Sequence, residues 1–304
     1  MQGKRKSEVA TQVKETIKAL LKRCSFPDRP VECAVSGGPD SMALLVLASS
    51  AGLDVTAIHV DHGIREGSEK EAKTVAAAAQ RFDARFESRT VQVKPGPNLE
   101  ERARQARYKV LPPDVLTGHT ADDQAETILL ALIRGSAWQG MSGITPSTNR
   151  PILQLRRSET VDLCSALDIK TVTDPSNMDP HFRRNRIRHE LLPLLNEIAD
   201  RDLVPILNRQ AELFRSGGKL LTEEAQKIDP TDTRALEEAP KIISREAIRN
   251  WIWETRGDDH PPDLATIDRV LDVAFLKSLA TDIGNGWRVS RTDRVLRIEK
   301  PEAI

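Results

Sequence analysis

The sequence carries no excess charge of either sign and no long apolar run. Its 304 residues include 45 lysines and arginines and 45 aspartates and glutamates, which cancel. Any nucleic-acid partner must therefore be held by local basic clusters and not by a field of the whole chain. No apolar run approaches the ~18–20 residues of a membrane span. We expect a soluble, cytoplasmic protein that does not enter a membrane.

Cysteine is equally scarce. Cys24, Cys33 and Cys164 are odd in number and widely spaced, and no Cys-x-x-Cys pair occurs. This pattern excludes a disulfide scaffold and predicts small buried side chains in a reducing compartment. Zinc is not expected either: His59 and His62 bracket Asp61, but no third soft ligand lies nearby in sequence.

The length is typical of about two domains, at roughly 100–200 residues each. In the first part, short apolar runs alternate with segments of helical periodicity, and neither repeats nor low-complexity segments occur. The predicted strands are 31–35, 55–60, 86–93 and 115–117, and the predicted helices are 7–23, 40–50, 68–82, 98–110, 121–134 and 158–167. Such alternation predicts an α/β fold with a parallel sheet covered on both faces, whose ligands bind at the carboxyl ends of the strands.

The last third of the sequence does not continue the alternation of strands and helices. Helical periodicity returns after about residue 200, and two short apolar runs near the end predict a hairpin. The predicted helices are a long one from about 203, then 244–255 and 263–279, followed by strands 287–290 and 295–298. We predict an α/β domain over 1–200 and a linker helix with a smaller, mainly helical domain over 201–304.

A serine- and glycine-rich turn follows the first predicted strand. It reads Ser36-Gly37-Gly38-Pro39-Asp40-Ser41. Glycines let the backbone approach a phosphate, and the N–H groups of the turn and helix start point at the anion. No lysine stands in the turn, which disfavours kinase or GTPase chemistry. The alternative is that Pro39 and Asp40 merely begin a helix.

Ser-Gly-Gly-x-Asp-Ser resembles the signature of the PP-loop ATP pyrophosphatase superfamily, which has the adenine nucleotide alpha hydrolase-like fold. The resemblance implies that ATP is split between its α and β phosphates. It also implies that Asp40 holds Mg²⁺ on the leaving pyrophosphate, as a hard oxygen ligand for a hard cation. The ATP-binding residues that it implies in this turn are Ser36, Gly37, Gly38, Pro39, Asp40 and Ser41.

Further stretches narrow the resemblance. In chain order they are His59-Val60-Asp61-His62-Gly63-Ile64-Arg65, Glu101-Arg102-Ala103-Arg104-Gln105-Ala106-Arg107-Tyr108, Gly118-His119-Thr120-Ala121-Asp122-Asp123-Gln124-Ala125-Glu126-Thr127, and Asp174-Pro175-Ser176-Asn177 with Arg183-Arg184-Asn185-Arg186-Ile187-Arg188. Over residues 30–200 they are similar to the tRNA(Ile)-lysidine synthetase family. The last third matches loosely, chiefly in Gly286-Trp287-Arg288-Val289, as in a short form with a small tRNA-binding domain.

The resemblance implies a ligase that joins free L-lysine to the wobble cytidine of the CAU anticodon of tRNA(Ile). ATP would adenylate the cytidine carbonyl, and AMP and pyrophosphate would leave. The implied catalytic residues are Asp40, Asp123 and Glu126, and the implied lysine contacts are Asp122, Asp123 and Glu126. Outside the turn, ATP would also contact His59, Arg65, Gly118 and His119. The tRNA would contact Arg102, Arg104, Arg107, Arg183, Arg184, Arg186 and Arg188. A homodimer is compatible with the sequence.

The acidic residues also make chemical sense by themselves. Asp122 and Glu126 stand four apart on the predicted helix, and Asp123 stands three from Glu126, so the three share one side. Carboxylates suit a dibasic amino acid such as lysine. The alternative is that Asp122 and Asp123 are helix-start acids that complement the macrodipole.

Two readings stay open for the arginine run as well. If the segment is helical, Arg184 and Arg188 share a face that can neutralise phosphates, and Phe182 can stack on an unpaired base. The alternative is a solvated face with Glu190 and Asp179 as ion-pair partners. For Trp138, base stacking and a core position are both open.

Three other functions compete with lysidine formation. A tRNA thiolase of the same superfamily needs a cysteine pair that this spacing does not offer. An amide-forming synthetase would not need the arginine clusters. A non-enzymatic RNA-binding module leaves the phosphate turn and the acidic residues without a function.

Overall fold

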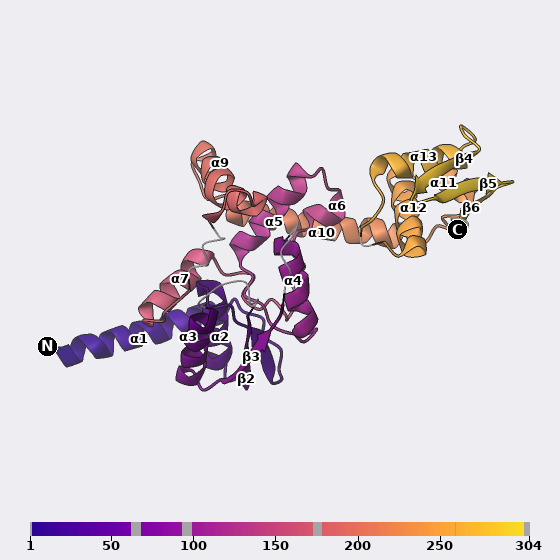
Figure 1. Ribbon diagram of the computed structural model, residues 1–304. Coiled ribbons are helices and arrows are strands. Elements are labelled where there is room, and N and C mark those ends of the chain that lie inside the picture. Colours follow the sequence, from indigo (N-terminus) through magenta and orange to yellow (C-terminus); the bar gives the residue numbers. More distant parts are fainter. Residues whose placement is uncertain (1, 62–67, 93–98, 173–177, 259, 301–304) are drawn as a thin grey trace. The chain divides into compact units, whose positions relative to one another are not determined.

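The computed structural model describes residues 2–61, 68–92, 99–172, 178–258 and 260–300 (Figure 1). The chain divides into two compact units, Met1–Ala211 and Glu212–Ile304. The division falls within the long helix α10 (Val204–Ala225), a little beyond the boundary predicted at residue 200.

The sheet of the first unit is parallel, as predicted. Its strands are β1 (Val31–Ala34), β2 (Val55–Asp61) and β3 (Arg85–Thr90), in the order β1-β2-β3. The fourth strand predicted at 115–117 is reduced to an isolated parallel bridge between Cys33 and Leu116. Beyond this bridge the N–H of Thr117 donates to the carbonyl of Asn149 (2.9 Å) and not to β1, and before it stand two prolines at 112 and 113, which lack a backbone N–H.

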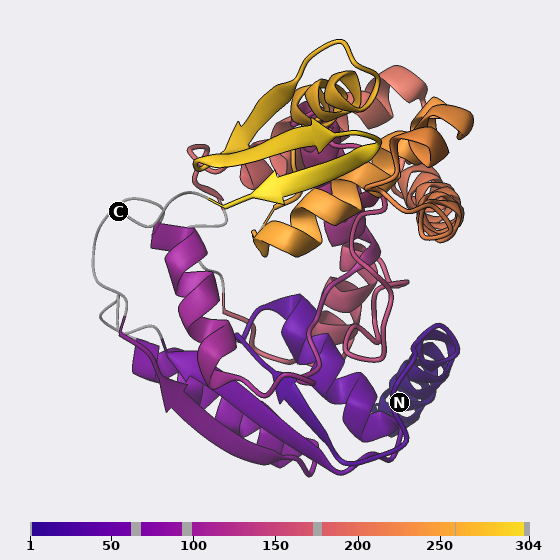
Figure 2. The ribbon, with the colours of Figure 1, turned by 90° about the vertical axis from the view of Figure 1, so that its right-hand side faces the viewer.

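Helices cover both faces of this sheet (Figures 1 and 2). The side chains of Val55 and Ala57 on β2 belong to one core cluster, and those of Ile58 and Val60 belong to another. The first cluster lies under α1 (Gln2–Leu21), α2 (Pro39–Ser50), α3 (Ser68–Arg81) and α7 (Arg157–Ala166), and the second under α4 (Leu99–Val110). The central strand β2 is accordingly buried from Val55 to Val60, whereas the edge strand β3 is polar and mostly exposed.

The rest of the first unit is helical. Its elements are α5 (Ala121–Ile133), α6 (Trp138–Met141), α8 (Arg183–Arg186), the π-helix η2 (Ile187–Leu191) and α9 (Leu192–Ala199). Ala125 and Leu129 of α5 pack with Ile187 and Leu192 in a separate apolar cluster. This packing brings the arginine-rich segment against the acidic helix α5.

The second unit combines helices with a small antiparallel sheet. It contains α11 (Thr233–Glu238), α12 (Lys241–Arg256) and α13 (Leu264–Ala274), then β4 (Ala280–Gly284), β5 (Trp287–Thr292) and β6 (Val295–Glu299). The predicted hairpin is confirmed as β5 and β6. The helix predicted over 263–279 ends early, because Leu276 adopts a left-handed φ of 62° that a helix cannot continue through.

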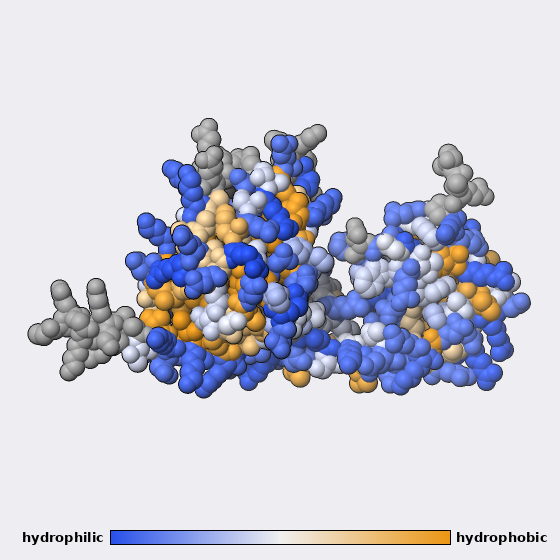
Figure 3. Space-filling model, turned by 90° about the horizontal axis from the view of Figure 1, so that it is seen from below, coloured by the Kyte–Doolittle hydropathy of each residue, from blue (hydrophilic) through white to orange (hydrophobic). Residues whose placement is uncertain are grey.

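The surface is mixed in character. One face of the molecule shows hydrophilic residues with hydrophobic ones among them on both units (Figure 3). Of the helices within the described ranges, none combines the length and the apolar character needed to cross a membrane.

Candidate active site

The phosphate turn has a conformation that only glycine supports. Gly37 has a φ of 91°, and a Cβ there would lie 2.9 Å from Cγ2 of Val172. Ser41 closes the turn: its hydroxyl donates to the carbonyl of Gly38 (2.9 Å) and accepts from the N–H of Ser36 (3.2 Å). The turn therefore leads into α2 with a fixed backbone, as an anion-binding helix start requires.

A second turn lies directly against the first. A Cβ on Gly118 would come within 2.9 Å of the carbonyl oxygen of Asp40 and 3.0 Å of the nitrogen of Ser41. Only glycine permits this approach. The predicted meeting of the two motifs at the carboxyl ends of the strands is thus present.

The acidic residues of α5 are buried. Oδ2 of Asp123 accepts from the N–H (2.8 Å) and the hydroxyl (2.9 Å) of Thr120 at the start of the helix. The side chain of Glu126, one turn further, is fully buried. Both carboxylates are therefore held away from water.

Three arginines surround Glu126. Its Oε1 accepts from Arg157 Nη1 and Arg188 Nε, both at 2.7 Å, and its Oε2 accepts from Arg184 Nε (2.7 Å) and Arg188 Nη2 (3.0 Å). Burial alone would raise the pKa of this carboxyl, but the hydrogen bonds and charges of Arg188, Arg157 and Arg184 outweigh it and lower the pKa to about 2. Glu126 is ionised and its hydrogen-bonding capacity is used.

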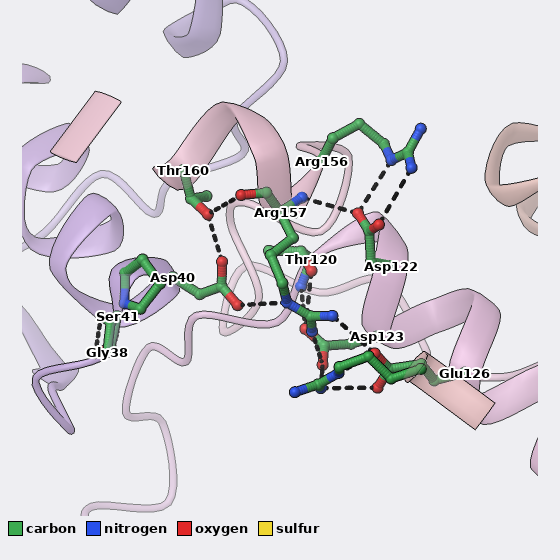
Figure 4. Close-up of polar contacts among 12 residues, drawn as sticks. Gly38, Asp40, Ser41, Thr120, Asp122, Asp123, Glu126, Arg156, Arg157 and Thr160 are labelled. Carbon is green, nitrogen blue, oxygen red and sulfur yellow. Dashed lines mark hydrogen bonds and ion pairs between the residues drawn. The ribbon is translucent and has the colours of Figure 1, made fainter. Parts of the chain in front are cut away.

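Arg157 joins the acidic helix to the phosphate turn (Figure 4). Its Nη2 donates to Asp123 Oδ1 (2.8 Å), and its Nε donates to Asp40 Oδ2 (3.2 Å). Burial would lower its pKa, but the charges of Asp123, Glu126 and Asp40 raise it. One guanidinium group thus contacts three carboxylates from two segments of the chain.

Asp40 is held on both of its oxygens. The hydroxyl of Thr160 donates to Oδ1, and Arg157 donates to Oδ2. Burial raises the pKa of Asp40, and the charge of Arg157 offsets this only in part. As for Mg²⁺, no group of three His, Cys, Asp or Glu side chains fit for a metal occurs among the described residues. Mg²⁺ usually takes one or two carboxylates together with substrate phosphates, and Asp40 beside the phosphate turn fits that pattern.

Asp122 has different partners. It accepts from Nε (3.0 Å) and Nη2 (3.2 Å) of Arg156 and from the backbone N–H of Arg157 (2.8 Å). Its carboxylate thus satisfies a free N–H group at the start of α7. Asp122 therefore caps α7 and not its own helix, where the sequence placed the alternative role, and its predicted contact with lysine stays a prediction.

The sequence analysis did not identify Arg156, Arg157 and Thr160. Their sequence does contain a signal, because Arg156 and Arg157 stand at the start of a helix. The macrodipole disfavours cations there, so two arginines in this place indicate that carboxylates lie nearby. The partners of these arginines stand more than thirty positions away, so the compensating charges are invisible locally.

The arginines predicted to bind tRNA separate into groups. Arg184 and Arg188 share a face, as predicted, and point to Glu126. Arg186 pairs instead with exposed Glu190, as the solvated alternative expects, and Arg183 is exposed. On α4, Arg107 lies 5.6 Å from the ring centroid of Tyr108, and Arg102 is half-buried. The side chain of Arg104, Arg65 and the run 174–177 lie outside the described residues.

Two predicted ATP contacts are histidines. His59 is 2% exposed, and its Nδ1 lies 2.9 Å from the carbonyl of Val35, just before the phosphate turn. A carbonyl only accepts, so Nδ1 carries a hydrogen, and the buried Nε2 has no partner in the described part of the chain. His119 contacts Thr117 through Nδ1 (2.8 Å).

The three cysteines are free thiols. Burial raises the pKa of Cys24 to about 11, of Cys33 to about 12 and of Cys164 to about 11. A thiol is nucleophilic as the thiolate, so these side chains are poorly suited to sulfur transfer.

The chain is similar to known proteins over most of its length. Residues 7–195 match the family model of the PP-loop domain. Together with the parallel sheet and the turn at Ser36–Ser41, this match defines a PP-loop ATP-binding protein. The tRNA(Ile)-lysidine synthase of Rhodococcus erythropolis is 40% identical over 242 residues, or 74% of each chain. That of Nocardia farcinica is 38% identical over 260 residues, 79% of this chain and 81% of the relative. The chain belongs to the tRNA(Ile)-lysidine synthase family.

A solved structure shares the fold alone. The U34-tRNA thiolase NcsA from Methanococcus maripaludis, solved with its [4Fe-4S] cluster, aligns with a TM-score of 0.51 at 18% identity. The alignment covers 67% of this chain and 80% of the thiolase. Identity this low says nothing of a shared substrate.

Proposed function

We propose that this enzyme joins free L-lysine to the wobble cytidine of the CAU anticodon of tRNA(Ile), with ATP converted to AMP and pyrophosphate. The single observation that carries the proposal is the contact between the phosphate turn and the buried acidic helix, made through Asp40 and Arg157. Membership in the tRNA(Ile)-lysidine synthase family supports it.

The phosphate turn and the acidic residues have different roles in the proposed reaction. The N–H groups and hydroxyls of Ser36–Ser41 bind the phosphates, and Asp40 would hold Mg²⁺, which would supply positive charge to the pyrophosphate. Adenylation turns the carbonyl oxygen of the cytidine into part of a good leaving group. Buried Asp123 and Glu126 are the proposed contacts of the cationic amino acid, which has to displace an arginine from them.

The arginines serve the RNA side of the proposal. Arg183 is exposed and available to phosphates, and Arg186 is exposed but would have to leave Glu190 to bind one. Arg184 and Arg188 donate to the buried carboxylates. High salt should therefore weaken tRNA binding steeply. Burial raises the pKa of all three thiols, which makes them poor nucleophiles and disfavours a thiolase reaction.

The test is AMP release with defined components. Turnover should require ATP, L-lysine and a tRNA(Ile) transcript with a CAU anticodon, and ornithine or a GAU anticodon should not substitute. Asp40→Asn should reduce pyrophosphate release by at least about a hundredfold, the range of a removed charge-stabilising group. The control Asp114→Asn removes an exposed carboxylate paired with Arg29 and should retain activity. Turnover with a sulfur donor in place of lysine, or near-normal turnover of Asp40→Asn, contradicts the proposal.

A further inference from the structure

Arg157 touches both halves of the proposed site. Its three guanidinium nitrogens each donate to a different carboxylate: Nε to Asp40, Nη1 to Glu126 and Nη2 to Asp123. Arg157 is 22% exposed in its side chain, and the partners range from fully buried to 22% exposed. The group is planar and rigid, so these contacts set the spacing of the phosphate turn from the acidic helix.

The carboxylates and guanidinium groups around Arg157 form a cluster in which the charges balance and Glu126 has no free acceptor position. Three carboxylates, Asp40, Asp123 and Glu126, face the guanidinium groups of Arg157, Arg184 and Arg188. Glu126 accepts four hydrogen bonds, which is the capacity of a carboxylate. The ammonium group of lysine finds no unused oxygen on Glu126 until one of the arginines moves away.

The contacts indicate which arginine moves. Arg184 and Arg188 contact only Asp123 and Glu126 within the cluster. Arg157 also contacts Asp40, in the first turn of the helix that follows the phosphate turn. A triphosphate bound there places several negative charges beside Arg157, and guanidinium groups bind phosphate bidentately. The nucleotide therefore competes with the carboxylates for Arg157 and not for the other two arginines.

We propose that Arg157 is a positioning residue that makes lysine binding depend on bound ATP. Without nucleotide, its guanidinium blocks Asp123 and Glu126. With nucleotide, it transfers to the phosphates. One acceptor position then becomes available to the ammonium group on Glu126 Oε1, which keeps its bond from Arg188, and one on Asp123 Oδ1, which keeps its bond from Arg184. By linkage, lysine strengthens nucleotide binding by the same factor. The inference rests on the proposed function for the identity of the amino acid.

Calorimetry can measure this coupling. Lysine is titrated into the full-length protein with Mg²⁺ and the tRNA transcript, with or without α,β-methylene ATP, whose bridging carbon prevents cleavage. For the wild type we expect about tenfold or greater tightening of the lysine Kd by the analogue, within the usual range of coupling between sites. In Arg157→Gln the ratio should fall to about one, with lysine binding even without the analogue.

Two further variants separate coupling from simple stability. Arg157→Lys keeps the charge but cannot reach three carboxylates at once, so its ratio should lie between those of the wild type and Arg157→Gln. The control Arg23→Gln removes another arginine contact with α7, at Glu159, and should keep the wild-type ratio. Tm values of all variants report on folding.

Three results contradict the inference. Equal lysine affinity of the wild type with and without the analogue removes the coupling. A wild-type ratio in folded Arg157→Gln shows that the residue is only structural. Failure of the wild type to bind lysine under any condition overturns the inference, and if lysine-dependent AMP release is also absent, the proposed function fails with it.

Discussion

Paired arginine and carboxylate groups occur in both units, in very different surroundings. In the first unit, fully buried Glu126 is shared by Arg157, Arg184 and Arg188. In the second, Arg245 on α12 makes two hydrogen bonds to Asp268 on α13, at 2.8 and 2.7 Å, and both side chains are about a third exposed. The distances are alike, so burial decides what each interaction contributes.

Glu126→Gln should have the largest effect. It leaves three guanidinium groups facing too few negative charges in a buried place, and breaking a buried ion pair by removing one partner costs about 3–5 kcal/mol. We expect that loss in the free energy of unfolding, measured with urea, together with loss of AMP formation. The control Glu190→Gln removes the exposed partner of Arg186 and should change stability by less than about 1 kcal/mol. Equal losses in the two variants would contradict the comparison.

Acid should remove the contribution of Glu126 to stability. The pKa of Glu126 is lowered from 4.5 to about 2 in the folded protein, so the unfolded chain takes up the proton first. Its contribution is complete above about pH 4.5 and is lost as the pH falls toward 2. The shift corresponds to stability on the order of 3 kcal/mol. Urea unfolding of the wild type and Glu126→Gln from pH 6 to pH 2.5 should converge, and parallel curves would contradict the assignment.

Substitution of His59 should have an intermediate effect, on ATP binding and not on stability. His59→Asn keeps a nitrogen near the position of Nδ1 that can donate to the Val35 carbonyl, but it removes the buried Nε2. Loss of one hydrogen bond to the nucleotide, about 1 kcal/mol, should raise the KM for ATP about fivefold with Tm nearly unchanged. The control is His260→Asn at an exposed position of the second unit. An unchanged KM for ATP would remove His59 from the nucleotide site.

The smallest effect is expected in the second unit. Arg245→Gln breaks both hydrogen bonds to Asp268, but solvent replaces them, so the free energy of unfolding should fall by only about 0–1 kcal/mol. The loss should shrink further in 0.5 M salt, which screens exposed charges. A loss comparable to that of Glu126→Gln would show that burial does not separate the two regions.

Much of the architecture could be predicted from local pattern. The parallel sheet, the phosphate turn at its edge and the terminal hairpin follow from alternating apolar runs and from Gly37 and Gly38. Element ends were less predictable. The strand predicted at 115–117 is only a bridge, and the helix predicted to end at 279 ends at Ala274. Apolar periodicity does not reveal where a strand stops pairing, nor that Leu276 adopts a left-handed φ.

The candidate site divides in the same way. Asp123 and Glu126 were predicted as a pair because they stand one helical turn apart. The inward direction of Arg184 and Arg188 could not be read from spacing, since an exposed face and a buried face of a short helix look alike in a run of arginines. The packing of Ile187 and Leu192 against α5 selects the inward one.

Local sequence by itself predicted a phosphate-binding turn at Ser36–Ser41, because two glycines and two serines stand between a buried strand and an apolar helix. Only the tertiary structure decided which cations face the acidic helix. Arg157 reaches Glu126 across 31 positions and Arg188 across 62, so no local pattern encodes their meeting. The burial of Glu126 then makes those contacts strong, because water no longer competes for its oxygens.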